Sequence, residues 1–171
     1  DTSTEYCSLA LWLDGEILSH SVLAGQKHSE LVLPMLNEML IEGGITLSHL
    51  DGFAFGAGPG SFTGLRIACG VIQGLAFALD KPVVDISTLE ALAQQAGSAN
   101  VITALDARMG EIYFAAYTKS SSNQWISVQS PMLCRPEFAP QLIGNDWVGC
   151  GSGFDRYPET LKGVYQDQFN E

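Results

Sequence analysis

The sequence predicts an α/β fold of two lobes, in which helices cover mixed β-sheets. Runs of alternating apolar residues, typical of strands, are followed by segments whose apolar residues recur at helical spacing. The stretch DTSTEYCSLALW, which begins at Asp1, also matches DARMGEIYFAAY, which begins at Asp106. Each has an Asp at a strand end, a short polar turn and an apolar strand that ends in an aromatic residue. The order of elements after the two stretches agrees as well, which indicates a duplicated unit.

A duplicated unit of strands followed by helices is the plan of the actin-like ATPase fold of sugar kinases and Hsp70-type proteins. We therefore expect duplicated mixed-sheet lobes, an N-terminal lobe over residues 1–98 and a C-terminal lobe over residues 99–171.

The N-terminal lobe shows strong local signals for its elements. Asp14-Gly15 between two alternating runs predicts a hairpin. Pro34 predicts that its helix either kinks or begins just before that residue. Ser87 and Glu90 form a capping-box pattern, and Gly97 predicts the helix end. The expected elements are a hairpin, helix, strand, helix, strand and helix, at residues 7–25, 28–44, 50–58, 62–79, 81–87 and 88–97.

The C-terminal lobe is expected to continue the pattern. Residues 101–117 predict a strand, tight turn and strand. We expect a third strand at 125–133, a short helix at 136–143 and a strand over 146–154 that runs into a glycine-rich turn. The last residues are polar and weakly patterned.

The composition excludes several classes of protein. The 171 residues are 46% hydrophobic and 16% charged, which is typical of a globular chain. The net charge of −11 should repel nucleic acid and anionic lipid, so a role near RNA would need a partner with a positive surface. Alternatively, the acidity only maintains solubility.

Location is also constrained by the sequence. We find no run of about 20 apolar residues and no signal-peptide pattern at the N-terminus, so we expect no membrane contact. The four cysteines lack C-x-x-C spacing, which predicts a reducing, cytoplasmic location without disulfides. They are Cys7, Cys69, Cys134 and Cys150.

The stretch GPGSFTGLR at residues 58–66 has the character of a phosphate-binding loop that runs into a helix. It fails the spacing of the Walker A motif, of the dinucleotide fingerprint and of the G-x-S-x-G elbow. Two interpretations remain, a tight strand-to-helix turn with a serine or threonine cap and a site for a nucleotide or anion. The candidate nucleotide or anion ligands are Gly58, Gly60, Ser61, Thr63 and Arg66.

Catalytic groups are hard to assign. In the actin-like fold, glycine-containing hairpin turns approach the nucleotide phosphates, but the first turn here has no glycine and the second has Arg108 and Met109 before its glycine. Asp1 and Asp106 could bind a metal or cap their turns, and turn capping is the favoured role. His28 has Val32 four residues later instead of a second histidine, so we assign no metal ligand and no catalytic residue.

Two helices of the N-terminal lobe carry more apolar surface than one sheet can cover. In residues 29–42 six apolar side chains span an arc of about 160°, wider than the roughly 100° stripe that faces a sheet, and only Leu31 and Ile41 lie outside this arc. Residues 67–79 carry no charge, and Gly70, Gly74 and Ala78 recur every four residues. The excess predicts either an interface with another protein or an intramolecular helix pair. The candidate interface residues are Val32, Leu33, Met35, Leu36, Met39, Leu40, Ile67, Gly70, Val71, Gly74 and Ala78.

The stretch GPGSFTGLRIACGVIQGLAFALDKPVVDISTLEALA at residues 58–93 closely resembles the signature segment of the TsaB (YeaZ) family. DTSTEYCSLALW, HSELVLPMLNEML and LDARMGEIYFAAY resemble the flanking motifs. The resemblance is close over residues 1–117 and looser beyond. The family's opening strand, before Asp1, and its C-terminal end are expected to be absent from this sequence.

The resemblance implies a two-lobed actin-like fold and a role in bacterial synthesis of N6-threonylcarbamoyladenosine at position 37 of tRNA (t6A37). Family members are regarded as non-catalytic paralogues of the threonylcarbamoyl transferase TsaD, which they bind through their first two helices, and the ATPase TsaE joins the complex. A homodimer is expected for the isolated protein, and tRNA is reached only through the complex. No cofactor is expected on this chain alone; ATP or ADP with Mg²⁺ would bind in the complex. The alternative is an ATP- or metal-dependent transferase or glycoprotease-like enzyme that acts on its own.

Overall fold

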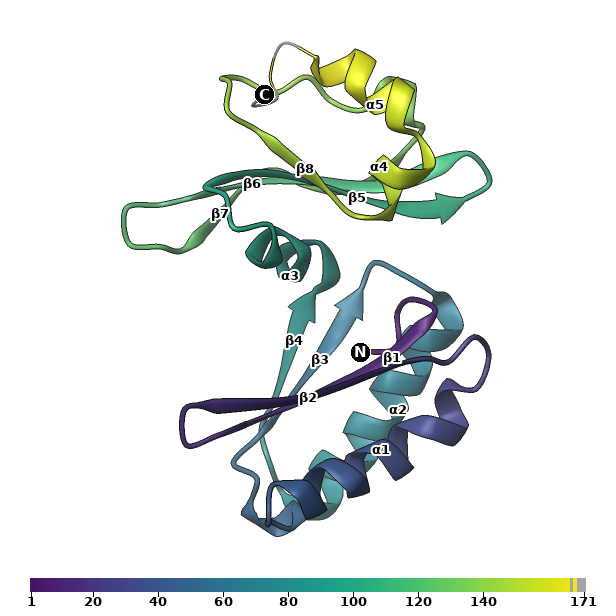
Figure 1. Ribbon diagram of the computed structural model, residues 1–171, viewed down its shortest axis with the longest axis vertical. Helices are drawn as coiled ribbons and strands as arrows, with labels where there is room; N and C mark the ends of the chain where they lie inside the picture. The colour runs from purple at the N-terminus through teal and green to yellow at the C-terminus, as the bar shows by residue number, and fades with distance from the viewer. Residues whose placement is uncertain (167, 169–171) are drawn as a thin grey trace. The chain divides into compact units, whose positions relative to one another are not determined.

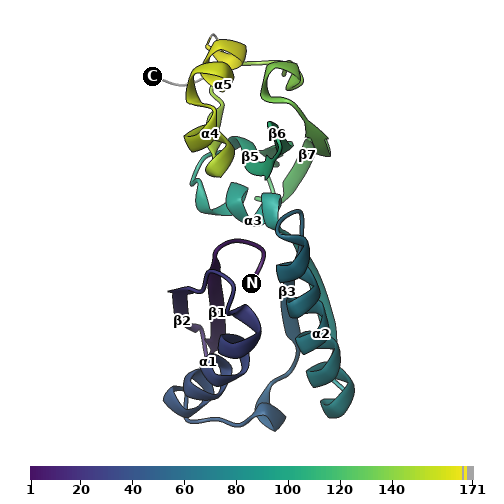
Figure 2. The ribbon, with the colours of Figure 1, turned by 90° about the vertical axis from the view of Figure 1, so that its right-hand side faces the viewer.

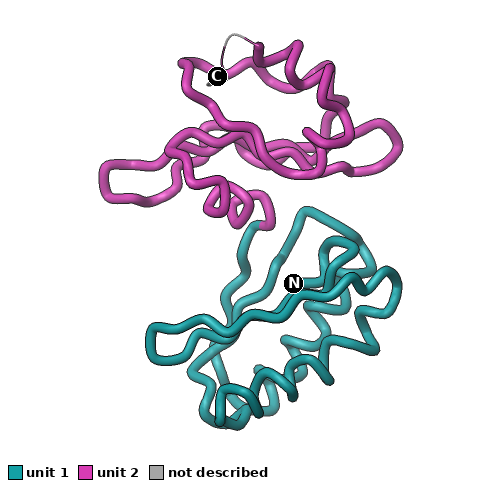
Figure 3. Tube along the Cα trace, in the orientation of Figure 1, with its two compact units in different colours: residues 1–87 teal, residues 88–171 magenta. Residues whose placement is uncertain are grey.

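The computed structural model describes residues 1–166 and 168, and the chain forms two compact units, Asp1–Ser87 and Thr88–Glu171 (Figures 1 and 3). The boundary lies before helix α3 (Thr88–Gln95), not at the expected 98/99. This correction has a packing reason, because Leu89 and Ala93 of α3 are fully buried in a core cluster of the second unit.

The first unit contains two separate two-stranded sheets and two long helices. The β1–β2 hairpin is confirmed, and its turn residues Asp14 and Gly15 have φ values of 51° and 89°, as a type I′ turn requires. Pro34 lies well inside α1, which starts at His28, so the alternative in which the helix begins just before the proline is wrong. The elements of this unit are β1 (Tyr6–Leu13), β2 (Glu16–Leu23), α1 (His28–Glu42), the short 3₁₀ helix η1 (Leu47–His49), β3 (Phe53–Gly58), α2 (Phe62–Leu79) and β4 (Val83–Ser87).

Each helix of the first unit packs on its own pair of strands. Val32 and Met35 of α1 share a buried cluster with the fully buried Cys7 of β1. Helix α2 connects β3 to β4, which pair in parallel, and it packs against β3. Figure 2 shows α1 beside the β1–β2 hairpin and α2 beside β3.

The second unit is a four-stranded sheet in the order β7-β6-β5-β8, with β5 parallel to β8 and the other neighbours antiparallel. Its elements are α3 (Thr88–Gln95), β5 (Asn100–Arg108), β6 (Glu111–Lys119), β7 (Trp125–Cys134), η2 (Pro136–Phe138), β8 (Val148–Cys150), α4 (Ser152–Arg156) and α5 (Pro158–Tyr165).

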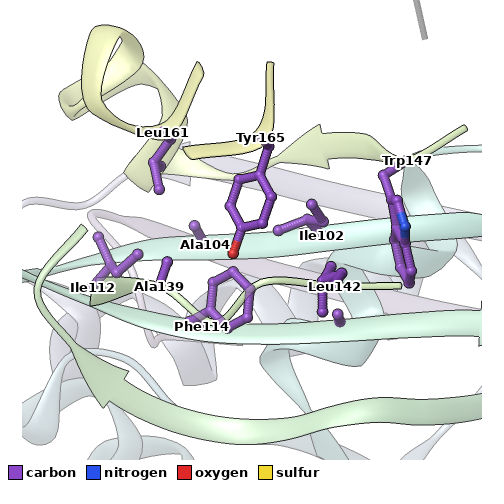
Figure 4. Packing of buried hydrophobic residues seen from close by; sticks show 10 residues of the cluster. Ile102, Ala104, Ile112, Phe114, Ala139, Leu142, Trp147, Leu161 and Tyr165 are labelled. Atoms are coloured by element: carbon purple, nitrogen blue, oxygen red, sulfur yellow. The ribbon is translucent and has the colours of Figure 1, made fainter. Parts of the chain in front are cut away.

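Two apolar cores support this sheet. Helix α3 packs over Val101 and Leu105 of β5. The other core is closed by α5, whose Leu161 and Tyr165 are fully buried, and the Tyr165 ring stacks on Phe114 at 6.1 Å between centroids (Figure 4). Burying both faces of β5 explains why that strand is nearly continuously apolar.

The second unit differs from the expected elements at three places. Residues 136–143 form only the 3₁₀ turn η2, because Pro140 interrupts any longer helix. The strand expected within 146–154 is confirmed at Val148–Cys150, but helix α4 begins at Ser152, where a glycine-rich turn was expected. Helix α5 was missed, although Pro158 at its first turn and Glu159 beside it are typical of a helix start.

Candidate docking surface and glycine loop

The glycine-rich loop ends at the N-terminus of α2, where Ser61 is the N-cap. The Ser61 hydroxyl accepts a hydrogen bond from the N–H of Gly64 at 3.3 Å. The Ser61 N–H donates to the carbonyl of Ser3 at 2.7 Å, and the Thr2 hydroxyl donates to the carbonyl of Gly64 at 2.7 Å. The capped strand-to-helix turn is therefore confirmed.

The glycines of this loop make room for the start of the chain. A Cβ at Gly60 would come within 2.7 Å of the Ser3 carbonyl oxygen. A Cβ at Gly64 would overlap the carbonyl oxygen of Thr2. The close approach at these two glycines is to the chain's own backbone, so it needs no phosphate to explain it.

The five candidate ligands of the loop do not converge on one point through their side chains. Ser61 is used as the helix cap, and Thr63 is exposed. The Arg66 guanidinium lies 3.9 Å from the centre of the Phe62 ring, which is a cation–π contact on the helix surface. Anion binding at Gly58, Gly60, Ser61, Thr63 and Arg66 stays a prediction.

The two duplicated aspartates cap their turns in the same way, as expected. An Asp1 carboxylate oxygen accepts the N–H of Ser3 at 2.6 Å and its hydroxyl at 2.7 Å. An Asp106 carboxylate oxygen accepts the N–H of Arg108 at 3.0 Å, and the Arg108 guanidinium lies 3.4 Å from the other oxygen. Each aspartate thus bonds the residue two positions on, which supports the internal duplication.

Four of the six candidate interface residues on α1 are already buried within the first unit. Val32, Met35, Met39 and Leu40 have exposed fractions of 1–8%. They form part of the unit's own core, so they are not offered to a partner, which corrects the expectation for this helix. Leu36 is half-buried and Leu33 is exposed.

Helix α2, in contrast, leaves most of its apolar surface open. Only three of its residues, Gly64, Ala68 and Ala76, are buried. Ile67 and Val71 are half-buried against the cluster that includes Met35 of α1. The exposed residues lie along one side of the helix when successive residues are placed 100° apart. We call this set the α2 stripe: Phe62, Thr63, Arg66, Cys69, Gly70, Gln73, Gly74, Phe77 and Ala78.

The α2 stripe has a phenylalanine near each end, with two glycines between them. Phe77 is 90% exposed and Phe62 is 67% exposed. A Cβ at Gly70 or Gly74 would meet no atom within 4 Å, so the helix backbone is open to a close neighbour there. The two phenylalanines were missed from the sequence, although Phe77 falls on the same side as Gly70 and Gly74 at helical spacing.

Helix α2 is also long and apolar enough to cross a membrane by length and composition, and 17% of it is buried in the structure. The strands that α2 connects do not fit a membrane-crossing helix. Helix α2 joins β3 to β4, and these strands lie side by side in parallel, so both helix ends return to the same sheet.

Known proteins resemble this chain along most of its length. A model of the family described as TsaD, tRNA N6-adenosine threonylcarbamoyltransferase, matches residues 19–136. The tRNA threonylcarbamoyladenosine biosynthesis protein TsaB of Escherichia coli K12 is 39% identical over 95% of this chain and 73% of its own length. The protein of the same name from Haemophilus influenzae is 43% identical over 93% of this chain and 72% of its own length. The chain belongs to the TsaB (YeaZ) family.

The solved structure of YeaZ from Pseudomonas aeruginosa is similar to this chain in three dimensions as well. It matches with a TM-score of 0.85 and 40% identity, over 99% of this chain and 78% of that chain. The TsaB family therefore has the α/β architecture described above, and the expectation of an actin-like fold with two lobes is confirmed.

Proposed function

We propose that this chain is a docking and activating subunit in the synthesis of N6-threonylcarbamoyladenosine on tRNA. The pathway is inferred from the relatives, which are named tRNA threonylcarbamoyladenosine biosynthesis proteins. The α2 stripe is the observation that supports a docking role. It exposes two phenylalanines on a helix that also carries two open glycines. Large exposed apolar patches on soluble proteins commonly mark sites where another protein binds.

The proposed partner is a transferase of the TsaD type. The chain itself resembles the TsaD family model, and like subunits commonly pair through the same surface patch on each. In our proposal, the stripe residues Gly70, Gly74 and Ala78 receive a partner helix, and the exposed Leu33 of α1 is a further candidate contact. A TsaE-type ATPase joins this pair, and a homodimer forms through the same surface when the partner is absent.

We propose that the chain does not catalyse the reaction itself. The Asp1 and Asp106 carboxylates are engaged in capping their own turns. Met109 stands at the tip of the second turn, 96% exposed, where an actin-like ATPase brings glycine backbone to a phosphate. Any ATP or ADP with Mg²⁺ would then bind in the complex with partners, and not on this chain alone.

The net charge of −11 supports indirect contact with tRNA. Phosphate contacts come mostly from Lys and Arg, and this chain has 8 of these against 19 acidic side chains. In the proposal, the partner supplies the positive surface. A pathway that acts on tRNA also supports the proposed cytoplasmic location.

The docking role is tested by gel filtration of mixtures of the chain with a TsaD-type transferase. Gly74→Arg should abolish co-elution, because the arginine side chain would occupy the space of the partner helix, while its Cβ meets no atom of its own unit within 4 Å. Gly163→Arg is the matched control, since Gly163 is also a helical glycine with open space around its Cβ, but on α5. Full co-elution of the Gly74→Arg chain would overturn the proposal.

A second experiment addresses the enzyme alternative. The isolated chain is titrated with Mg-ATP in a calorimeter, and the mixture is then assayed for hydrolysis. We expect neither heat of binding nor turnover. Saturable binding with turnover by the chain alone would favour an ATP-dependent enzyme.

A further inference from the structure

A line of three polar side chains runs along the exposed side of α2. Arg66, Gln73 and Asp80 follow one another at intervals of seven residues. Seven residues make nearly two turns of an α-helix, so the three side chains lie on the same side of α2. All three are exposed, and Asp80 is the C-cap that follows the α2 stripe. This side of the helix therefore carries a cation, an amide and a carboxylate in that order.

The two charges of this line are not paired within their own unit. Arg66 contacts the ring of Phe62, and neither Arg66 nor Asp80 forms an ion pair among residues 1–166 and 168. Helix α2 carries no other charged side chain, and Lys81, directly after Asp80, is half-buried. A charge from outside the unit can therefore contact Arg66 and Asp80 without displacing an existing ion pair.

Aspartate is also an unfavourable residue at position 80 as far as its own helix is concerned. The φ of Asp80 is 51°, in the left-handed region, which glycine or asparagine usually occupies at the end of a helix. Its carboxylate lies at the C-terminus of α2, which is the negative end of the helix dipole. The local structure thus gives no reason for a carboxylate here, whereas a contact with another molecule does.

The line of polar residues is complementary to a reversed copy of itself. Arg66 and Asp80 each lie seven residues from Gln73, which is about 10.5 Å along the helix. In an antiparallel pair of α2 helices with a two-fold axis at Gln73, Arg66 of each copy faces Asp80 of the other. The two Gln73 amides then face each other, and each has both a donor and an acceptor to exchange. A parallel pair in the same register instead places arginine against arginine and aspartate against aspartate.

The apolar residues of the stripe agree with the same register. With the axis at Gln73, Phe77 of one copy lies opposite Cys69 of the other, beside Gly70. The Phe77 side chain is 90% exposed, and a Cβ at Gly70 would meet no atom within 4 Å. The protruding ring of each copy therefore meets open space on the other copy.

We propose that the α2 stripe pairs with the stripe of a second copy in the antiparallel direction, and that the contacts between Arg66 and Asp80, made twice, fix this direction and register. The inference rests on the proposed function, in which a second copy covers the stripe when the transferase is absent. It adds the residues that select the arrangement. Polar and charged residues at the contact between two helices fix direction and register in coiled coils in the same way.

The direction is tested by charge reversal in the full chain, with the dissociation constant of the dimer measured by sedimentation equilibrium at low salt, where charges are screened least. Arg66→Glu turns two attractive contacts into two repulsive ones, so this constant should rise by roughly tenfold or more. Adding Asp80→Arg to the same chain restores opposite charges and should reverse most of the loss. The control, Lys162→Glu, makes the same charge change at an exposed residue of α5 and should leave the constant unchanged.

A disulfide reports the register without any change of charge. Cys69 is an exposed free thiol on the stripe, and Phe77→Cys adds a second thiol there. Within one chain the two positions are about 12 Å apart along the helix, too far for a disulfide, so a bond between them joins two copies. After mild oxidation, peptide mapping should find bonds between positions 69 and 77. A parallel pair would give 69–69 and 77–77 bonds instead.

The outcomes separate this inference from the proposed function. An Arg66→Glu dimer as tight as that of the unchanged chain, or 69–69 and 77–77 bonds in place of 69–77 bonds, would overturn the antiparallel register and leave the docking role intact. If the unchanged chain stays monomeric at every concentration, both this inference and the proposed homodimer are wrong. Co-elution with a TsaD-type transferase would then still decide the docking role by itself.

Discussion

The same substitution at two glycines of α2 should change stability in opposite directions. Alanine favours a helix interior over glycine by about 1 kcal/mol. At Gly70 a Cβ meets no atom within 4 Å, so Gly70→Ala should raise the free energy of unfolding of the first unit by about 1 kcal/mol. At Gly64 the new Cβ overlaps the backbone carbonyl of Thr2, and no side-chain rotation can move either atom away.

The cost at Gly64 is that of overpacking. Forcing one extra carbon into a filled site typically costs about 1–3 kcal/mol. The chain start would also have to move, which would strain the hydrogen bond from the Thr2 hydroxyl to the Gly64 carbonyl. We expect Gly64→Ala to lower the free energy of unfolding by about 2 kcal/mol, so that the two variants differ by about 3 kcal/mol.

The assay must report on the first unit alone. The Cys7 thiol is fully buried there, so its labelling by an alkylating reagent across a urea series measures the opening of that unit. Quantification by mass spectrometry of the Cys7 peptide separates it from the other cysteines. A Gly64→Ala chain as stable as the Gly70→Ala chain would refute the claim that the loop glycines exist to admit the Asp1–Ser3 backbone.

Three further predictions concern the cysteines and the second unit. Leu161→Ala, which empties a fully buried position against the sheet, should lower the free energy of unfolding of the second unit by about 2–5 kcal/mol in urea unfolding, whereas Thr160→Ala at an exposed neighbour should not. At pH 8, iodoacetamide should label the exposed Cys69 far faster than Cys150, because burial raises the pKa of the Cys150 thiol to about 11; equal rates would contradict this. The same shift, with that of Tyr165 in the same direction, means that the folded unit holds these protons more tightly than the unfolded chain. The contribution of these groups to the free energy of unfolding should therefore be fully present below about pH 9 and be lost as the pH rises towards 11. A urea midpoint that does not change with pH over that range would exclude the effect.

The sequence predicts the local structure of this chain best where one short-range signal decides it. Asp14-Gly15 defines the first hairpin, and Ser61 defines the start of α2, because each acts through its own neighbours. Helix α5 was missed because its helical character depends on Leu161 and Tyr165 packing on a sheet formed much earlier in the chain.

The candidate surface was harder to predict because periodicity gives an apolar face but not the element that covers it. The sequence gives α1 and α2 similar excess apolar surface. In the structure, Met35 and Met39 of α1 are buried by its own unit, whereas Phe77 of α2 is left open. Likewise, the sequence around Gly64 is typical of a phosphate-binding loop. Only the structure shows that Gly64 instead makes room for the backbone of Thr2, which lies 62 positions away in the sequence.

The most direct test of the docking role is threonylcarbamoyl transfer to tRNA in a reconstituted mixture of this chain with TsaD-type and TsaE-type proteins. We predict that omission of the chain and its replacement by the Gly74→Arg variant lower transfer to the same basal level, while the Gly163→Arg variant supports the full rate. Full transfer with the Gly74→Arg variant, or transfer by this chain without a TsaD-type protein, would contradict a docking subunit that acts through the α2 stripe.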